Sequence, residues 1–195
     1  MSRVIYSMGI SLDGYIVGPD GRFDWTVPSE ELFGISVDEI KQTGTYLLGR
    51  RLYETMLYWE DVDQSPSLDF STLEWARLWR ALPKVVFSTT LHQVEGNARL
   101  ATEGLAGELH RLRAESVQGE IAIGGAGLAA QAAALDLIDE YRIRIHPVLL
   151  GGGTPFFAPL RARTDLELVE NRTVCPGVVY LRYRVTRPAD ADARS

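Results

Sequence analysis

Short apolar segments alternate along this chain with segments in which apolar residues recur at helical spacing. Residues 85–87 and 121–123 are apolar without interruption, as is typical of parallel strands that are covered on both faces. The last segment, residues 178–186, instead alternates apolar and polar residues, which predicts a strand with one solvated face. Together these patterns predict an α/β fold of three layers, in which helices flank a mostly parallel, eight-stranded sheet that ends in an antiparallel hairpin.

Turn and helix-ending residues place the individual elements. Pro83 ends a helix that carries Trp75 and Trp79 on one face, and Cys175-Pro176-Gly177 marks the turn of the C-terminal hairpin. We expect strands at residues 4–10, 45–48, 84–88, 98–101, 120–123, 141–149, 166–174 and 178–186, and helices at residues 29–42, 50–56, 71–82, 103–116 and 128–135. The length suits a single domain at residues 1–187, followed by a disordered tail at residues 188–195, which has no apolar period.

Composition excludes several classes of protein. The 195 residues include 20 basic and 26 acidic ones, and the net charge of −6 argues against a nucleic acid as the main partner. Cys175 is the only cysteine, which rules out an internal disulfide framework and any zinc site built on paired cysteines. His92 and His110 show no ligand spacing, so we expect no metal. No apolar segment is long enough to span a membrane, and we expect a cytoplasmic protein.

Glycines, arginines and hydroxyl residues follow three of the predicted strands. Gly49-Arg50-Arg51 ends one strand and opens a helix, and cations at the positive end of a helix dipole indicate a bound anion. Ser88-Thr89-Thr90 follows the next strand, and Gly124-Gly125-Ala126-Gly127 leads into the helix that includes Leu128. Hydroxyls and backbone amides at such strand ends bind phosphate. Because ligands of layered sheets bind at the carboxyl ends of strands, these segments predict a phosphate-binding edge.

Each signal also has a purely structural interpretation. The arginines could be solvated or paired with Glu54 and Asp61, the hydroxyls could serve turns and caps, and the glycines could only permit a tight turn. Residues 125–130 fit a relaxed dinucleotide-binding fingerprint. That fingerprint lies late in the chain, however, and no acidic residue follows at the spacing of a ribose ligand, so we reject a Rossmann fold.

The first strand runs into a long, glycine-punctuated loop that includes Asp13, Phe23 and Trp25. Such a loop beside a sheet is typical of a cover over a binding site. Glu30 follows in the first turn of the next helix, where a carboxylate also serves the helix dipole. His146 lies near a strand end and either faces the substrate or is a strand-face histidine without a catalytic role.

Strand faces also carry arginines without an assigned role. Arg142, Arg144 and Arg182 lie in the last strand patterns. They could serve a dimer interface or meet solvent, and the sequence does not choose between the two.

The ordered motifs resemble those of a known family. Ser11-Leu12-Asp13-Gly14-Tyr15-Ile16, Leu48-Gly49-Arg50, Val86-Phe87-Ser88 and Ile123-Gly124-Gly125 occur in the order seen in dihydrofolate reductase-like proteins. The segment from Pro147 to Phe157, with its three consecutive glycines, resembles the branch formed by the reductase domain of bacterial riboflavin biosynthesis (the RibD C-terminal type) and its stand-alone relatives. The resemblance covers residues 3 to 186.

The resemblance implies an NADPH-binding sheet of eight strands in a protein that usually forms a homodimer. Its cofactor-binding positions match Gly49, Arg50, Arg51, Ser88, Thr89, Thr90, Gly124, Gly125, Ala126, Gly127 and Leu128, with the nicotinamide near Met8. An arginine at residue 50 or 51 would hold the 2′-phosphate of NADPH, because a guanidinium binds phosphate bidentately.

On the same grounds we expect a reductase that transfers a hydride from NADPH to a C=N or C=O group of a small polar heterocycle, such as a pterin or a pyrimidine. Asp13, the acid of the riboflavin-type motif, is the expected catalytic and substrate-binding residue, and Phe23 and Trp25 would wall the substrate site. True dihydrofolate reductases place an acid soon after a tryptophan and a proline, and here Glu30 matches it. The alternatives are true dihydrofolate reduction and non-catalytic binding of a nicotinamide nucleotide.

Overall fold

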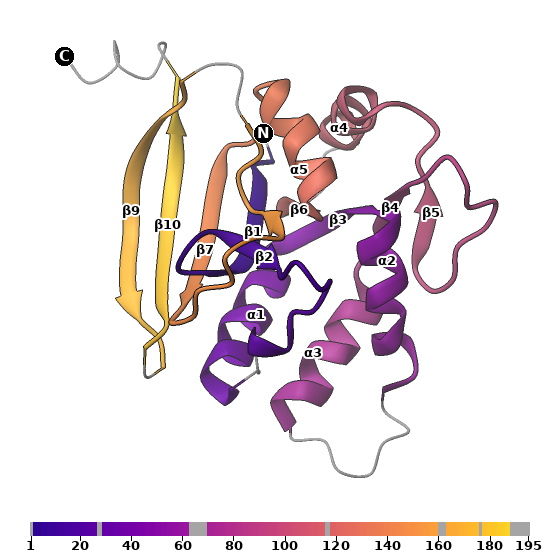
Figure 1. Cartoon of the computed structure of the whole chain (residues 1–195). Helices are drawn as coiled ribbons and strands as arrows, with labels where there is room; N and C mark the ends of the chain where they lie inside the picture. The colour runs from indigo at the N-terminus through magenta and orange to yellow at the C-terminus, as the bar shows by residue number, and fades with distance from the viewer. Residues whose placement is uncertain are drawn as a thin grey trace.

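The computed structural model describes residues 2–26, 29–62, 70–115, 118–159, 163–175 and 177–187. An eight-stranded sheet runs through it in the order β5-β4-β3-β6-β1-β7-β10-β9, as Figure 1 shows. The pairs from β5 to β7 are parallel, whereas β10 runs antiparallel to both β7 and β9. The predicted α/β class and the C-terminal antiparallel hairpin are therefore confirmed.

The main sheet consists of β1 (Val4–Ser11), β3 (Thr43–Gly49), β4 (Lys84–Phe87), β5 (Ala98–Leu100), β6 (Glu120–Gly124), β7 (Glu140–His146), β9 (Asp165–Thr173) and β10 (Val179–Thr186). The helices are α1 (Glu30–Gln42), α2 (Arg50–Met56), α3 (Phe70–Ala81), α4 (Leu105–Ala114) and α5 (Ala126–Ala134), with short 3-10 helices η1 (Asp24–Thr26) and η2 (Leu57–Glu60). These match the predicted elements to within a few residues at each end.

Two features differ from the sequence-based expectation. The predicted strand at residues 141–149 ends at His146, because the chain there leaves the sheet and enters a glycine-rich turn. Two very short strands, β2 (Tyr15–Val17) and β8 (Thr154–Pro155), pair antiparallel beside the main sheet. They were not predicted, since two or three residues cannot display a period. The predicted tail at 188–195 lies outside the described residues, as does Pro176 of the hairpin turn.

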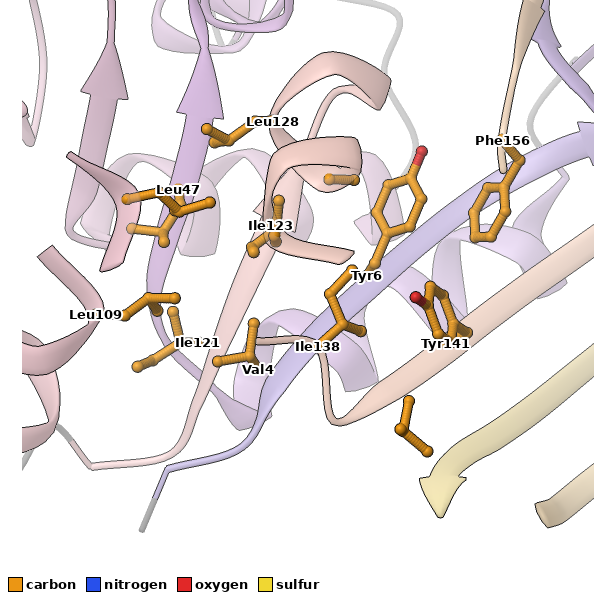
Figure 2. Packing of buried hydrophobic residues seen from close by; sticks show 14 of the residues in the cluster. Val4, Tyr6, Leu47, Leu109, Ile121, Ile123, Leu128, Ile138, Tyr141 and Phe156 are labelled. Carbon is orange, nitrogen blue, oxygen red and sulfur yellow. The ribbon is translucent and has the colours of Figure 1, made fainter. Parts of the chain in front are cut away.

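Two apolar clusters hold the three layers together. On one face of the sheet, Leu109 of α4 and Leu128 of α5 pack with strand residues such as Leu47 and Ile123, and Figure 2 shows this packing. On the other face, Trp79 of α3 belongs to a cluster with residues of α1, α2, β3 and β4. Helices α4 and α5 therefore cover one face, while α1, α2 and α3 cover the other. No helix among the described residues is long and apolar enough to cross a membrane.

Parallel pairing brings the ends of five strands to one edge. Gly49 at the end of β3 pairs with Phe87 at the end of β4, and Leu48 pairs with Gly124 at the end of β6. On the other side, Ser11 at the end of β1 pairs with His146 at the end of β7. Residues that are far apart in the sequence are therefore neighbours along this carboxyl edge.

A buried carboxylate anchors the edge strand β5 to α4. The Glu108 side chain is fully buried, and its carboxylate accepts hydrogen bonds from Nη2 and Nη1 of the Arg99 guanidinium group, at 2.7 and 3.2 Å. It also accepts the Thr102 amide at 2.8 Å and forms an ion pair with Arg111. Burial alone would raise the pKa of Glu108, but these donors and positive charges outweigh it and hold the pKa at about 2.

We expect the variant Glu108→Gln to be destabilised in a pH-dependent way. A carboxyl group whose pKa is lowered on folding stabilises the native state above its unfolded pKa of about 4.3, and this contribution disappears as the pH falls towards about 2. The loss at pH 7 should be roughly 2–3 kcal/mol and should shrink between pH 5 and pH 2, measured by urea unfolding. Glu115→Gln, at the exposed C-cap of the same helix, is the control. An equal loss at pH 3 and pH 7 would contradict the assignment.

Candidate active site at the carboxyl edge of the sheet

A cleft of about 1250 Å³ opens along the carboxyl edge. Its floor is formed by Met8 and Gly9 of β1 together with Arg144 and His146 of β7. Residues of α1, α2, η2 and α3 form one wall, and the first turn of α5 forms another. The loop before α1 and the start of β8 close it from the side. A volume of this size accommodates a dinucleotide fragment and a small second molecule.

Many of the predicted cofactor-binding residues lie together in this cleft. Those that line it are Met8, Gly49, Arg50, Arg51, Gly125, Ala126, Gly127 and Leu128. Phe23, a predicted wall of the substrate site, lines it as well. The convergence follows from the parallel register, because β3 and β6 are adjacent strands and end side by side.

Two glycines leave empty space beside the cleft. Gly49 has an ordinary extended backbone with φ −73°, and a Cβ atom added to it would meet nothing within 4 Å. The same is true of Gly127 in the first turn of α5. Neither glycine is therefore required by the turn or the packing of the protein itself. Their missing side chains leave room for a ligand that approaches the backbone closely.

The neighbouring glycines, Gly124 and Gly125, are required by the structure of the protein itself. A Cβ atom on Gly124 would come within 2.4 Å of Leu52 and 2.6 Å of Tyr46. Gly125 has φ +92°, a left-handed conformation that favours glycine. The structural interpretation therefore holds for these two residues, and Gly124 is not among the residues that line the cleft.

The two arginines differ in their partners. Arg50 lies 3.2 Å from Glu54 in an exposed ion pair one helical turn apart, as the alternative interpretation anticipated. Arg51 also lines the cleft, and no ion pair involves it among the residues described here. Its guanidinium group is thus available to an anion in the cleft.

The hydroxyl residues after β4 form a turn. The Ser88 Oγ accepts the amides of Thr90 and Leu91 at 3.1 and 3.0 Å. Ser88, Thr89 and Thr90 follow Phe87, which itself lines the cleft, but they are not among the lining residues. Their part in cofactor binding stays a prediction.

Asp13 and Glu30 lie outside the cleft lining. The Asp13 carboxylate is exposed and accepts the amides of Leu150 and Gly151, the latter at 2.7 Å. Hydrogen bonding from Ser11 lowers the pKa of Asp13, and these amides add to the effect. The visible role of Asp13 is thus to hold the glycine-rich turn after β7. Its catalytic role stays a prediction.

Glu30 is not among the residues of α1 that line the cleft. Leu32, Phe33 and Ser36 line it, and they share one face of the helix. Glu30 is exposed at the helix start, where Ser29 caps the helix by accepting the Leu32 amide. The proline of the motif, Pro28, lies outside the described residues. A catalytic role of Glu30 also stays a prediction.

Trp25 packs against His146 rather than lining the cleft. The two rings meet edge to face with centroids 5.4 Å apart. His146 is 6% exposed, and burial, followed by the positive charge of Arg144, lowers its pKa. The imidazole is therefore neutral at pH 7. Gly9 lies directly beside it, since a Cβ atom on Gly9 would stand 3.1 Å from His146 Nε2.

The strand-face arginines make internal ion pairs. Arg142 is almost fully buried and pairs with Glu120 and Glu140, and Arg182 pairs with Glu140 as well. The interpretation that they simply meet solvent is thus wrong for these two, because Glu140 of β7 and Glu120 of β6 supply the matching acids. Arg144 differs, since it pairs with Glu39 at 3.1 Å and also lines the cleft.

Sequence reasoning left Arg144 without a role and gave His146 two alternatives. The available signal was their spacing, because residues two apart in a strand share a face. What the sequence did not reveal is that β7 ends one residue after Ile145 and so brings this pair to the cleft.

A second hollow of about 630 Å³ lies on the α5 face, between Tyr6, Tyr141 and Phe156. It shares no lining residue with the cleft among the residues described, and none of the predicted site residues lines it. No group of three or more potential metal-ligating side chains was found within the described ranges. The cleft is therefore the candidate active site.

Comparison with solved structures defines the class of protein. A putative riboflavin biosynthesis protein from Shewanella sp. PV-4 superposes with a TM-score of 0.76 at 24% identity, over 95% of this chain and 99% of that one. Dihydrofolate reductase from Enterococcus faecalis, in complex with NADP(H), gives 0.58 at 15% identity, over 95% and 97%. The fold is that of dihydrofolate reductase-like proteins.

The family follows from the sequence comparison. Residues 2–180 match the model of the RibD C-terminal domain. The uncharacterized protein YyaP of Bacillus subtilis is 31% identical over 181 residues, which are 93% of this chain and 94% of that protein. The chain belongs to the RibD C-terminal domain family, as the ordered motifs predicted.

We expect Asp13→Ala to loosen the turn after β7. Loss of the carboxylate frees the amides of Leu150 and Gly151, so their hydrogen exchange should accelerate severalfold, measured by mass spectrometry at pH 7. Asp20→Ala in the loop after β2, which removes the contact to the Arg22 amide, is the matched control. Unchanged exchange at residues 150 and 151 would show that the carboxylate does not hold this turn.

Proposed function

We propose that this protein is an NADPH-dependent reductase acting on a C=N or C=O group of a small planar substrate. The observation that carries the proposal is the space left by Gly49 and Gly127 on the same cleft that Arg51 lines. Family membership supports it, as does the fold shared with a reductase solved with NADP(H).

The residues of the cleft fit this coenzyme. Gly49, Gly125 and Gly127 would let its diphosphate approach the backbone and the first turn of α5. Arg51, with Arg50, would hold a 2′-phosphate, which distinguishes NADPH from NADH. Met8 and Gly9 would form the surface under the nicotinamide. When bound, the coenzyme supplies the hydride for the reaction.

The side chains of the protein must then orient the substrate and supply it with a proton. A hydride adds two electrons to the substrate carbon, and the nitrogen or oxygen of the former double bond takes up one proton. Apart from the arginines, His146 is the side chain with a titratable group that lines the cleft within the described residues. We therefore assign the proton transfer to His146, which must first take up a proton from solvent and then donate it to the nitrogen or oxygen, with Asp13 and Glu30 as the alternatives from the sequence.

True dihydrofolate reduction has less support. The described residues that line the cleft include no carboxylate. An amino-substituted pterin ring presents N–H donors, for which a carboxylate is the matching acceptor. Glu30, the acid matched by the sequence, is not among these lining residues. The proposal therefore favours an oxidoreductase of the riboflavin-type branch.

We expect NADPH to bind more tightly than NADH and Arg51→Ala to remove that preference. Loss of one charge-assisted contact to the 2′-phosphate should weaken NADPH binding about 10- to 100-fold and leave NADH binding within about twofold. Calorimetric titration measures both. Arg184→Ala, on the distant strand β10, is the control. If neither nucleotide binds to the unaltered protein, the proposed function is wrong.

We expect Gly127→Ala to weaken NADPH binding without lowering the stability of the fold. Alanine in a helix is more stable than glycine by about 0.5–1 kcal/mol, and a Cβ atom there meets no protein atom. The variant should therefore unfold at the same or a higher temperature, while its affinity for NADPH falls at least tenfold. Gly34→Ala is the matched control, because Gly34 is a helical glycine with equally free space that does not line the cleft. It should keep full affinity.

A further inference from the structure

The hollow on the α5 face has walls of two kinds. Helix α5 contributes alanine side chains, and aromatic rings from β7 and from the segment after β8 face them. These lining residues include Ala129, Ala130, Ala133, Tyr141, Phe156 and Phe157. The volume of about 630 Å³ falls within the usual size of a small-molecule pocket, about 300–1,000 Å³. Small side chains opposite aromatic rings leave a space that suits a flat ring.

The hydroxyl group of Tyr6 is buried in this region without a partner. Tyr6 lines the hollow from β1 and is 1% exposed. Its ring stacks on that of Phe156, with centroids 4.3 Å apart, as Figure 2 shows. No described residue forms a hydrogen bond with its Oη atom. A buried hydroxyl without a partner destabilises a folded protein, whereas phenylalanine would fill the same space without that cost. The packing of the protein therefore does not account for this hydroxyl.

Tyr141 places a second hydroxyl beside the first. In the parallel pairing of β1 with β7, Tyr141 lies directly opposite Tyr6, and the two rings meet edge to face at 6.4 Å. Tyr141 is 5% exposed and also lines the hollow. Burial raises the pKa of both hydroxyls, so both are neutral at pH 7. Each tyrosine thus keeps an O–H group that can be donated to a ligand.

The charged side chains around the hollow cancel in pairs. Arg163 lies 2.7 Å from Asp165, and Arg187 lies 3.4 Å from Asp136. These four are the charged side chains among the described residues that line the hollow. Paired charges give no net attraction for an ion, and an ion is costly to bury among apolar side chains. The hollow therefore favours an uncharged ligand.

We propose that this hollow is a second ligand site, which binds a neutral aromatic compound through a carbonyl oxygen. The carbonyl oxygen accepts a hydrogen bond from Tyr6, and Tyr141 is the second donor. A carbonyl fits two O–H donors because it has two lone pairs and no proton of its own. The ring of the ligand lies between the alanines of α5 and the side chains of Phe156 and Phe157.

This site is independent of the proposed function. The hollow and the cleft share no lining residue within the described part of the chain. Helix α5 contributes its first turn to the cleft and its later turns to the hollow. A ligand in the hollow therefore leaves the coenzyme region of the cleft open.

The test compares two probes of one shape on the full chain. In α-methylstyrene a CH₂ group replaces the carbonyl oxygen of acetophenone, and neither compound is charged. Acetophenone should bind at least about fivefold more tightly than α-methylstyrene, because only acetophenone can accept the tyrosine hydroxyls. Benzoate, which is anionic, should bind at least about tenfold more weakly than acetophenone. NMR titration measures all three affinities.

Tyr6→Phe removes the unpartnered hydroxyl and keeps the ring. Its affinity for acetophenone should fall about five- to tenfold, while its affinity for α-methylstyrene stays within about twofold. The variant should unfold at the same or a higher temperature, since a buried group without a partner is removed. A purely structural role of the hydroxyl would instead lower that temperature. Tyr46→Phe, in β3 and outside the lining of the hollow, is the matched control and should leave both affinities unchanged.

A second variant locates the probes by filling the hollow. Ala133→Leu should lower the affinity for both probes at least about tenfold, because the larger side chain takes their space, and leucine is nearly as favourable in a helix as alanine. Ala114→Leu, at the exposed end of α4 outside the hollow, should change neither affinity. Tyr6→Phe adds no atoms, so it carries the test where the leucine variant does not fold.

An infrared measurement reports the hydrogen bond directly. A carbonyl that accepts hydrogen bonds absorbs at a lower frequency than a free one. The carbonyl stretch of bound, ¹³C-labelled acetophenone should therefore lie at a higher frequency in Tyr6→Phe than in the unaltered protein. In Tyr46→Phe it should not move.

Four outcomes overturn the inference. Two concern chemistry: acetophenone binds no more tightly than α-methylstyrene, or Tyr6→Phe leaves acetophenone binding unchanged. The third is loss of acetophenone binding when NADP⁺ is added, which would place the probe in the cleft. The fourth is an affinity that falls as the protein concentration rises, which would mean that a second copy of this chain covers the hollow. Failure to bind NADPH would overturn only the proposed function.

Discussion

Parallel strand pairing is the constraint on which the rest of the molecule depends. Because β4, β3, β6, β1 and β7 run in one direction, every chain segment that leaves their carboxyl ends emerges at one edge. Helices α2 and α5 begin there, directly after β3 and β6. A shift in this register would separate Gly49 from Gly125 and remove the cleft, whatever the side chains.

The cleft is defined as much by missing side chains as by those present. Gly124 and Gly125 are glycines because of crowding and backbone conformation. Gly49 and Gly127 are neither crowded nor in a left-handed conformation, and their free space lies on the cleft. This difference separates a glycine that the protein's own structure requires from one that it does not require, and it can be recognised only when the neighbouring atoms are known.

The acidic residues show where motif reasoning reaches its limit. Asp13 and Glu30 were predicted from spacing in the chain, and both side chains have visible structural surroundings outside the cleft lining. The surface of the cleft instead presents arginines and a neutral histidine. A carboxylate two or three positions along a loop or helix can face another direction, since a helix turns by about 100° per residue.

The sequence by itself determined the elements, their order and the edge at which chemistry would gather, because apolar periodicity, proline and glycine act locally. It also determined the family, through four short motifs in order and the segment from Pro147 to Phe157. The tertiary structure decided which charges meet the cleft. Arg142 and Arg144 share a face of β7, yet Arg142 meets Glu120 in the sheet interior while Arg144 reaches the open edge. The two-residue repeat of a strand determines on which face of the sheet a side chain lies. Only the tertiary packing determines which other residues cover that face.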